Sequence, residues 1–354
     1  MLFEENKSLA PLTTLGIGGP ASWFAQAETE AEVAEAAVWA DAHCVPSFVL
    51  GGGSNLLVAD AGFNGLVLHI ALRGIEAEHH RDATIYRVAA GEIWNDFVER
   101  SLEDNSAGIE CLVGIPGTVG GTPVQNVGAY GQEVAPSIER VRAFDRASNA
   151  FVEFAAAQCG FAYRRSRFNT TDRGRFIVTR VDFRLKPGGA PTLRYAELQR
   201  AFPESSTPAL SEVAAAVQRI RQSKGMLLVE GDPDCRSAGS FFKNPLVPCA
   251  QMEQIATSLG KEPPHFPAGP GPVSAGQVKL SAAWLIEQAG FAKGFARGAA
   301  GISTRHTLAL INRGGATAAE ILALANEIAA TVEARFGIRL QREPELVGFD
   351  QGTA

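Results

Sequence analysis

The sequence predicts a mixed α+β fold that is divided among more than one domain. Its 354 residues exceed the size of about 250 residues beyond which single hydrophobic cores stop growing. The first 145 residues alternate short apolar strands with glycine-rich turns and two helical stretches, a rhythm typical of α+β proteins. Strand patterns continue to residue 200, and the clearest helical pattern lies in the last third of the chain. No segment recurs at a fixed period, which excludes solenoids and propellers.

The composition is that of a globular protein, with 46% hydrophobic and 20% charged residues. The formal net charge is −6 and no dense Lys/Arg stripe is present, which argues against a nucleic-acid partner, because such binding depends on neutralising phosphates. No apolar run approaches the roughly 18 residues that span a bilayer, and the first residues lack the pattern of a secretion signal. We therefore expect a cytoplasmic protein with no membrane partner.

Neither a disulfide framework nor a metal site is predicted. The five cysteines are scattered and form no C-x-x-C pair. The six histidines show no H-E-x-x-H or H-x-E spacing. We therefore expect no metal in the mechanism.

The first helix is predicted from a capping box. Thr29 and Glu32 have the spacing at which two side chains satisfy the free backbone N–H groups of a helix start. Val33, Ala37 and Ala40 then fall on one face of that helix. Apolar strands bounded by glycine, aspartate or a short polar run are predicted at 56–58, 66–68 and 86–89.

The middle of the chain contains one clear strand and two helices. Residues 176–185 predict the strand, and from Val181 onward apolar and polar residues alternate, as in a strand with one exposed face. Helices are predicted at 211–222 and at 281–289. The Pro/Gly-rich run 263–272 predicts a surface loop.

The longest helix is predicted near the end of the chain. A second capping box, Thr317 with Glu320, marks its start, and Gly337 marks its end. Its apolar face consists of Ile321, Leu324, Ile328 and Val332.

A first glycine-rich segment consists of Gly51, Gly52, Gly53, Ser54 and Asn55. It separates the apolar strand 48–50, which we expect to be buried, from the next strand. A Rossmann fingerprint or a P-loop needs a helix directly after its glycines, so both are excluded. Three consecutive glycines can instead turn several backbone N–H groups toward one anion, such as a pyrophosphate, with the Ser54 hydroxyl alongside. A plain tight turn is the alternative for this segment alone.

A second glycine-rich segment runs from Gly114 to Gly131. Its first part contains Gly114, Ile115, Pro116, Gly117, Thr118, Gly120 and Gly121. Two such stretches in one domain favour backbone wrapped closely around a long ligand. Irregular loops that cover a sheet are the alternative.

Three polar residues are candidates for chemistry, and each has a structural alternative. Ser240 lies between a glycine and two phenylalanines, where its hydroxyl could donate a proton in a partly dehydrated pocket or simply form a turn. No G-x-S-x-G surrounds it, which disfavours a hydrolase nucleophile. Arg164 could bind a carboxylate bidentately or lie as a solvated strand arginine. Glu345 stands beside apolar residues, where burial would suit it to acid chemistry, or it is a surface carboxylate.

Taken together, these segments resemble the UDP-N-acetylenolpyruvoylglucosamine reductase family over nearly the whole chain. The resemblance implies an FAD-binding region of the vanillyl-alcohol-oxidase type, made of two α+β subdomains, and a separate α+β substrate-binding domain. We expect the first subdomain at 1–68, the second at 69–224 with a C-terminal return at 338–354, and the substrate-binding domain at 225–337. The segments that carry the resemblance are 14–19, 50–57, 114–131, 163–164, 237–245, 279–290 and 343–345.

The same resemblance implies roles for individual residues. Both glycine-rich segments, 51–55 and 114–121, would hold the FAD pyrophosphate and nearby atoms. Ser240 matches the proton donor of the family, and Arg164 and Glu345 match its other two catalytic positions. Tyr195 matches the tyrosine of the subclass that closes a loop over the substrate diphosphate. Further substrate ligands would be Lys224, Lys243 and Asn244. The chain departs from the family pattern after Lys224, where the connection 225–230 is longer.

The implied reaction reduces UDP-N-acetylglucosamine enolpyruvate to UDP-N-acetylmuramate in peptidoglycan precursor synthesis. NADPH would reduce FAD, and the reduced flavin would pass hydride to the enolpyruvyl group. We expect a monomer whose partner is this small UDP-sugar. An oxidase of the same FAD fold that acts on an alcohol or sugar, and a flavin-fold binding protein without activity, are the alternatives.

Overall fold

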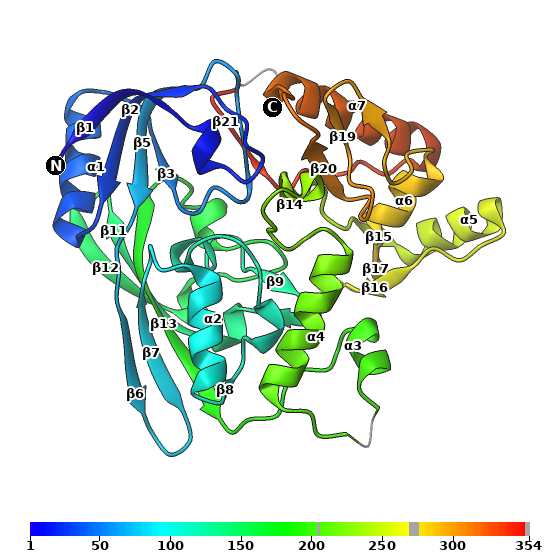
Figure 1. Cartoon of the computed structure of the whole chain (residues 1–354), viewed down its shortest axis with the longest axis horizontal. Helices are drawn as coiled ribbons and strands as arrows, with labels where there is room; N and C mark the ends of the chain where they lie inside the picture. Colours follow the sequence, from blue (N-terminus) through cyan, green and yellow to red (C-terminus); the bar gives the residue numbers. More distant parts are fainter. Residues whose placement is uncertain (204–205, 269–275, 351–354) are drawn as a thin grey trace. The chain divides into compact units, whose positions relative to one another are not determined.

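Two larger sheets, a two-stranded sheet and several helices form the first of two units into which the chain folds (Figure 1). The computed structural model describes residues 1–203, 206–268 and 276–350. The first unit contains residues 1–7, 21–53 and 63–223, and the second contains 8–20, 54–62 and 224–354. The chain therefore passes from one unit to the other five times.

The first sheet is built around the central strand β5, Phe63–Ile70. Strands β2, Pro20–Ala27, and β3, Ser47–Leu50, both pair with β5 in parallel, and β1, Phe3–Ser8, lies next to β2. Helix α1, Glu30–Ala42, links β2 to β3, which lie on either side of β5, because two parallel strands of one sheet need a crossover connection. Its apolar residues share one core with the sheet. The predicted capping box is confirmed, because Thr29 and Glu32 each accept a hydrogen bond at the helix start.

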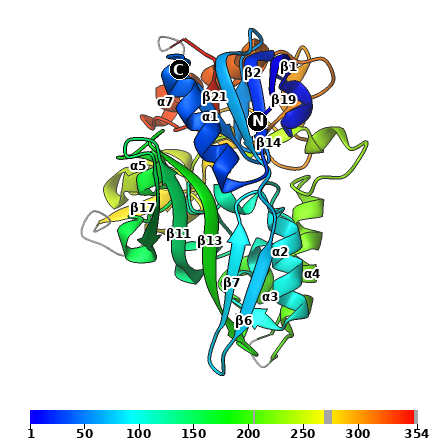
Figure 2. The same ribbon diagram turned by 90° about the vertical axis from the view of Figure 1, so that its left-hand side faces the viewer.

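The second sheet is antiparallel and runs in the order β12-β11-β13-β7-β6, with the short β8 also on β13. Figure 2 shows β11, β13, β7 and β6 side by side. Two helices contribute apolar side chains to the same core as this sheet: α2, Trp94–Glu103, and α4, Leu210–Ser223. Its strands are β6 Ile75–His79, β7 Thr84–Ala89, β8 Ser106–Ala107, β11 Ile138–Asp145, β12 Ala150–Ala155 and β13 Phe176–Pro187.

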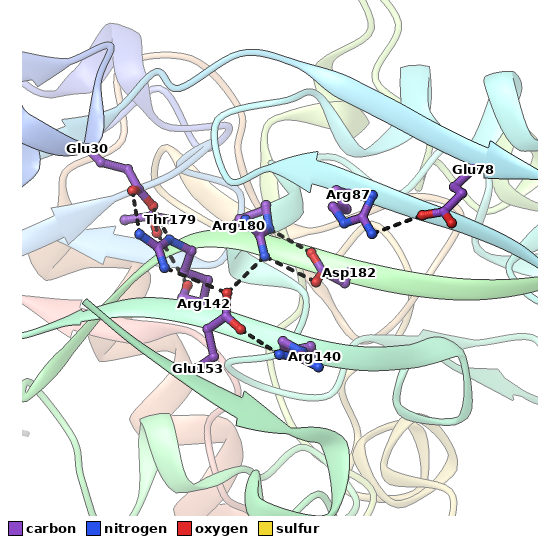
Figure 3. Close-up of polar contacts among 9 residues, drawn as sticks. All are labelled: Glu30, Glu78, Arg87, Arg140, Arg142, Glu153, Thr179, Arg180 and Asp182. Atoms are coloured by element: carbon purple, nitrogen blue, oxygen red, sulfur yellow. Dashed lines mark hydrogen bonds and ion pairs between the residues drawn. The ribbon is translucent and has the colours of Figure 1, made fainter.

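Alternating charges line part of this sheet and join it to α1 (Figure 3). Arg142 of β11 binds Glu30, the first residue of α1, with two hydrogen bonds of 2.8 and 2.9 Å. The Thr179 hydroxyl donates to the same carboxylate at 2.7 Å. Arg180 and Glu153 extend the network across the neighbouring strands. Arg140 and Asp182 are further members of the network, and Arg87 and Glu78 form a separate ion pair on the same sheet.

Short elements complete the first unit and lie mainly in the glycine-rich part of the chain, where the density of glycine predicts no long helix or strand. The hairpin of β9 and β10 is the element that matters most below. These elements are η2 Glu110–Leu112, η3 Val119–Gly121, β9 Gly128–Ala129, β10 Gln132–Glu133, η4 Ala135–Ser137, η5 Ala156–Gln158, η6 Arg167–Asn169 and α3 Ala196–Ala201.

The second unit contains an antiparallel sheet in the order β14-β20-β19-β18, a three-stranded sheet in the order β15-β17-β16, and the parallel pair β4 and β21. Its strands are β4 Leu56–Val58, β14 Ser237–Ser240, β15 Leu246–Pro248, β16 His265–Pro267, β17 Gln277–Leu280, β18 Ala296–Arg297, β19 Ala300–Ile302, β20 Ala309–Asn312 and β21 Glu345–Val347. Its helices are η1 Ala10–Leu12, η7 Pro233–Cys235, α5 Cys249–Leu259, α6 Ala282–Gln288 and α7 Ala318–Phe336.

Helix α7 has the ends and the buried face that the sequence predicts. Thr317 and Glu320 form the capping box, and Gly337 ends the helix at φ +64°. Asp60, which follows β4, also accepts hydrogen bonds from the N–H groups of Ala318 and Ala319 at 2.7 and 3.0 Å. A carboxylate at a helix N-terminus accepts hydrogen bonds from the free N–H groups, and its negative charge is attracted to the positive end of the helix dipole. Asp60 thus fixes the chain after β4 to this helix.

Three local expectations need correction. Strand 48–50 is not buried throughout, because β3 is an edge strand in which Val49 is 39% exposed. Asp182, expected on an exposed face, is 7% exposed and pairs with Arg180 at 2.7 Å. The Pro/Gly-rich run 263–272 includes strand β16, while its residues 269–272 lie outside the described residues.

The units also divide the chain differently from the expected domains. The expected boundary at 224/225 is close to the observed one, since the second unit resumes at Lys224. The segment 338–354 was expected to return to the second FAD subdomain, but its described residues belong to the second unit. The physical reason is that β21 pairs with β4 and that Ile338 and Leu340 lie in the core of that unit. No helix in the described part of the chain is long and apolar enough to cross a membrane.

Candidate active site

The two glycine-rich segments meet within the first unit. A β carbon added to Gly52 would lie 2.6 Å from the α carbon of Gly117, and one added to Gly51 would lie 2.7 Å from the Thr118 hydroxyl. Gly53 and Gly117 have φ angles of +61° and +126°, which residues with side chains rarely adopt. Glycine is therefore required at this contact, and the segments 51–53 and 114–118 form one backbone surface, called the glycine cradle below.

Neighbouring side chains hold the glycine cradle in place. The Gly114 N–H donates to Asn95 Oδ1 at 2.6 Å, and the Gly114 carbonyl accepts from Arg221 Nε at 3.1 Å. Arg221 comes from α4 and is only 5% exposed. Burial lowers the pKa of its guanidinium, and interactions with Tyr130 oppose that change. Bare backbone beside a buried arginine fits the pyrophosphate of FAD, which needs close approach and positive charge.

The end of the first glycine-rich segment belongs to the second unit, where it contacts the C-terminal motif. Asn55 Nδ2 donates to the Glu343 carbonyl at 3.3 Å, and the Glu345 N–H donates to the Asn55 carbonyl at 3.0 Å. Strand β21 continues this contact, because Glu345 pairs with Leu56 of β4. Ser54 and Asn55 thus lie next to the segment that carries Glu345.

Ser240 is the last residue of β14 and is partly exposed. It pairs with Ala309 of β20, and the next residue, Phe241, donates its N–H to the Leu308 carbonyl at 2.8 Å. Phe241 and Phe242 are buried, at 0% and 2% exposure. These two anchored aromatic residues fix the backbone directly after the Ser240 hydroxyl.

The motif around Thr14 supports the other end of the same strand. The Thr14 hydroxyl donates to the Ser237 carbonyl at 2.6 Å. Leu15 and Ile17 are core residues of the second unit, and the Leu15 carbonyl accepts from Asn312 Nδ2 at 3.0 Å. The segment 14–19 therefore has a structural role in holding β14.

Ser240 and Glu345 lie on neighbouring segments that are hydrogen-bonded to each other. The Glu343 N–H donates to the Phe241 carbonyl at 2.9 Å, and the Lys243 N–H donates to the Gln341 carbonyl at 2.9 Å. The two candidate catalytic residues are therefore one residue before and two residues after this antiparallel contact.

Arg164 lies in the first unit, in a backbone conformation that is costly for its residue type. Its φ angle is +54°, and such a conformation costs about 1–3 kcal/mol. Nearby contacts hold the turn: Arg164 Nη2 donates to the Gly128 carbonyl at 2.8 Å, and its own carbonyl accepts from Asn169 Nδ2 at 3.2 Å. Asn126 also donates to the Ala162 carbonyl at 3.1 Å. Backbone strain that the surroundings enforce is common at functional sites.

Tyr195 also belongs to the first unit and directly precedes α3. Its ring meets the ring of Tyr130 edge to face, with centroids 5.2 Å apart. A β carbon on Gly131 would lie 3.1 Å from the Tyr195 nitrogen. The hairpin of β9 and β10 therefore contacts Arg164 through Gly128 and Tyr195 through Tyr130 and Gly131.

Lys224 begins the last segment of the second unit, and the connection after it follows a defined path. Asp234, which is 4% exposed, accepts from the Thr304 hydroxyl at 2.6 Å and from Arg305 Nε at 3.0 Å. A β carbon on Gly225 would lie 3.1 Å from the same Arg305 nitrogen. Asp232 also forms an ion pair with Arg305. Arg305, which both aspartates bind, therefore lies close to Gly225, the residue next to Lys224.

Lys243 and Asn244 directly follow the Phe241 contact in the second unit. The Lys243 backbone joins the segment that leads to Glu345, as described above. Asn244 Oδ1 accepts from the Ala282 N–H at 2.9 Å, at the start of α6. One side of the Asn244 amide is therefore committed to a helix end, a role that the sequence pattern does not reveal.

Comparison with known proteins gives the class first. Residues 21–149 match the family described as an FAD binding domain. Residues 232–347 match the family described as the C-terminal domain of UDP-N-acetylenolpyruvoylglucosamine reductase. The chain is thus an FAD-containing oxidoreductase, and the expected α+β fold, with an FAD-binding region and a separate second part, is confirmed.

Whole-length relatives then give the family. The chain is 49% identical to the UDP-N-acetylenolpyruvoylglucosamine reductase of Streptomyces coelicolor, over 96% of this chain and 89% of the relative. It is 45% identical to that of Thermobifida fusca, over 98% of both chains. The crystal structure of the Thermus caldophilus reductase is similar at a TM-score of 0.65 and 27% identity, over 98% of both chains. The chain belongs to the UDP-N-acetylenolpyruvoylglucosamine reductase family.

Proposed function

We propose that the protein reduces UDP-N-acetylglucosamine enolpyruvate to UDP-N-acetylmuramate, with NADPH as reductant, for peptidoglycan precursor synthesis. Family membership supports the substrate class. The observation that carries the proposal is the backbone contact that holds Ser240 and Glu345 on neighbouring segments. A hydroxyl proton donor and a carboxyl group fixed this way suit the protonation of a carbon next to the substrate carboxylate.

The glycine cradle would hold the FAD pyrophosphate, with Arg221 behind Gly114 supplying positive charge. When bound, FAD supplies the hydride that NADPH delivers to it and that the terminal vinyl carbon of the substrate receives. Ser54 and Asn55 extend the binding segment. The UDP part of the substrate would be bound by Tyr195, Lys224, Lys243 and Asn244. Their hydroxyl, ammonium and amide groups can donate hydrogen bonds to the oxygens of a diphosphate.

Hydride addition to the vinyl carbon leaves negative charge on the adjacent carbon, and this charge spreads into the substrate carboxylate as an enolate. Arg164 would donate hydrogen bonds to that enolate, and Glu345 would donate one from its carboxyl O–H, a role that requires the protonated form. The Ser240 hydroxyl would then give its proton to the carbon. The product gains one hydride and one proton, and the serine recovers its proton from solvent.

The experiment that tests this function is NADPH oxidation by the purified, FAD-loaded protein. Steady NADPH consumption should occur only when the enolpyruvyl UDP-sugar is present, and the product should be the lactyl sugar. Peroxide formation from an alcohol without NADPH would identify an oxidase instead. A protein that turns over neither substrate set would be a flavin-fold binding protein. A preparation that contains no flavin and does not take up FAD would contradict the proposal as a whole.

A further inference from the structure

A cluster of buried polar residues in the first unit binds Thr192, which lies three residues before Tyr195. The Thr192 N–H donates to Glu110 Oε1 at 2.7 Å, and its hydroxyl oxygen accepts from Gln132 Nε2 at 3.2 Å. The Thr192 carbonyl accepts from the Cys111 thiol at 3.2 Å. Both backbone polar atoms of Thr192 and its hydroxyl therefore have partners in this group, which is called the Glu110 cluster below.

The Glu110 cluster lies in the interior and its members bind one another. Glu110, Cys111 and Gln132 are 1%, 0% and 8% exposed. Glu110 Oε1 also accepts from Gln132 Nε2 at 3.0 Å, and Glu110 Oε2 accepts from the Gly108 N–H at 2.8 Å. Gln132 Oε1 accepts from the Cys111 N–H at 2.8 Å. Because each carboxylate oxygen faces N–H donors, the carboxylate defines one geometry for three segments of chain.

The residues after Thr192 continue along the same hairpin. A β carbon on Gly131 would lie 2.9 Å from the β carbon of Arg194, so a side chain at 131 would displace this segment. Tyr130 meets the Tyr195 ring. The Glu110 cluster is thus the polar end, and the Tyr130 contact the aromatic end, of a seat for residues 192–195.

We propose that Glu110 and Gln132 are positioning residues for substrate binding, which place Tyr195 by fixing Thr192. This proposal rests on the role of Tyr195 in binding the substrate diphosphate given under the proposed function. Burying a carboxylate is costly. A buried carboxylate that is hydrogen-bonded to fixed partners defines their geometry more strictly than an apolar side chain of the same volume would. A seat formed before substrate arrives lowers the ordering cost of binding, so its loss weakens binding and leaves the chemical step unchanged.

The test replaces Glu110 by Gln, which keeps the shape of the side chain. The new NH2 group faces N–H donors on either side, Thr192 and Gln132 on one and Gly108 on the other, so at least one hydrogen bond is lost. The matched control is Asp145→Asn. Asp145 is also a buried carboxylate of the first unit, 3% exposed, but its partners are Arg175, Ala147 and Ser148, far from residues 192–195 in the sequence.

Two readouts separate positioning from general stability. The first is the rate of trypsin cleavage after the exposed Arg194, measured by mass spectrometry on the FAD-loaded protein without substrate. We expect Glu110→Gln to raise this rate about tenfold, the effect of losing one hydrogen bond to a charged group, and Asp145→Asn to leave it unchanged. The second is steady-state kinetics, where Glu110→Gln should raise KM for the enolpyruvyl UDP-sugar by a similar factor with kcat unchanged.

The outcomes distinguish this inference from the function on which it rests. Unchanged cleavage after Arg194 in Glu110→Gln, or an equal increase in Asp145→Asn, would contradict the claim that the Glu110 cluster fixes residues 192–195. Faster cleavage with an unchanged KM would overturn its role in substrate binding. If Tyr195→Phe also leaves KM unchanged, the failure lies in the role assigned to Tyr195. If Glu110→Gln does not fold, Thr192→Val removes only the Gln132 contact of the seat and should change both readouts in the same direction, and no change would again overturn the proposal.

Discussion

At the scale of single residues, Ser240 combines a fixed backbone with a partly exposed side chain. Phe241 and Phe242 anchor the chain in the core directly after it, whereas the serine itself is not buried. A small hydroxyl in this position keeps the rotation it needs to present and recover a proton. Replacing the hydroxyl should therefore affect proton transfer and leave the fold intact.

Ser240→Ala should separate the two halves of the reaction. NADPH should still bleach the flavin at the normal rate, because the hydroxyl takes no part in that step. Reoxidation by the enolpyruvyl UDP-sugar should slow about 10²-fold or more, the typical contribution of one general acid. Stopped-flow absorbance of the flavin measures both steps. Ser237→Ala, on the same strand, is the control and should reoxidise like the unaltered protein; near-normal reoxidation in Ser240→Ala would remove Ser240 from the mechanism.

Sequence patterns identified candidate residues in chemically distinctive surroundings but not the buried polar groups that hold them. Ser240 stands between glycine and phenylalanine, a context visible in the sequence. Arg221 and Glu110 give no such signal, because their partners Gly114 and Thr192 lie 107 and 82 residues away. A buried charge is recognised only when the fold shows what surrounds it.

At the scale of elements, the glycine cradle depends on two turns that touch through their backbones. Its two contacts differ in kind, because Gly51 faces the Thr118 side chain and Gly52 faces the Gly117 backbone. A side-chain neighbour can be removed by mutation, whereas a backbone neighbour cannot. This difference allows the contact between the turns to be tested directly.

Gly51→Ala and Gly52→Ala should both lower FAD occupancy, because each added β carbon forces the turns apart. Adding Thr118→Ala should rescue Gly51→Ala, since the next atom near that position is 4.0 Å away. The same addition should not rescue Gly52→Ala. Flavin absorbance per protein after gel filtration gives the occupancy, with Thr118→Ala alone as the reference. Equal rescue of both variants would show that the turns do not meet in this way.

The charge network in Figure 3 should make the link between α1 and the second sheet sensitive to acid. The Arg142 guanidinium, helped by the Thr179 hydroxyl, holds the pKa of Glu30 below its ordinary value of 4.5. Because the folded protein binds this proton less readily than the unfolded chain, the stabilisation is present above pH 4.5 and is lost as the pH falls below it.

Glu30→Gln should therefore lower Tm at pH 7, and its difference from the unaltered protein should shrink as the pH falls below 4.5. Differential scanning calorimetry across pH 3–7 provides the measurement. Glu103→Gln, on an exposed residue at the end of α2, is the control and should change Tm little. A Tm difference that is constant across this range would exclude the carboxylate of Glu30 as its cause.

Capping boxes located the starts of two helices, and the helices predicted at 211–222 and 281–289 also formed, whereas no range was predicted for α2 or α5. Thr29 and Thr317 each begin a capping box, and both helices start where the sequence places them. Helices α2 and α5 follow Ile93 and Pro248, neither of which caps the helix with a side chain. Strand 48–50 shows the same limit for sheets, because burial depends on neighbouring strands, and an apolar run does not reveal that it lies at an edge.

At the scale of the whole molecule, each unit has its own hydrophobic core, but neither is one continuous piece of chain. The second unit takes Leu15 and Ile17 from the N-terminal part and Leu57 from β4. The sequence therefore indicated more than one core but not this exchange of segments, because the pairings that create it join residues far apart in the chain.

A fragment of residues 224–354 should not fold by itself, although it contains most of the second unit. It lacks Thr14 and Asn55, which bind β14 and the Glu345 segment, and it lacks β4, the partner of β21. We expect near-UV circular dichroism without defined signals and urea unfolding without a cooperative transition. Cooperative unfolding of the fragment would show that the two N-terminal segments are dispensable.

The pairing of β4 with β21 also determines when β4 can reach its native state during synthesis of the chain. Leu56 leaves the ribosome long before its partner Glu345, which is 289 residues later in the chain. At the usual pace of translation this wait lasts about 15–60 s. During that time β4 is an open strand edge, which in a crowded cell invites pairing with other chains. Synthesis of β21 therefore ends the vulnerable period and, in the same event, delivers the carboxyl group of Glu345 on which the proposed chemistry depends.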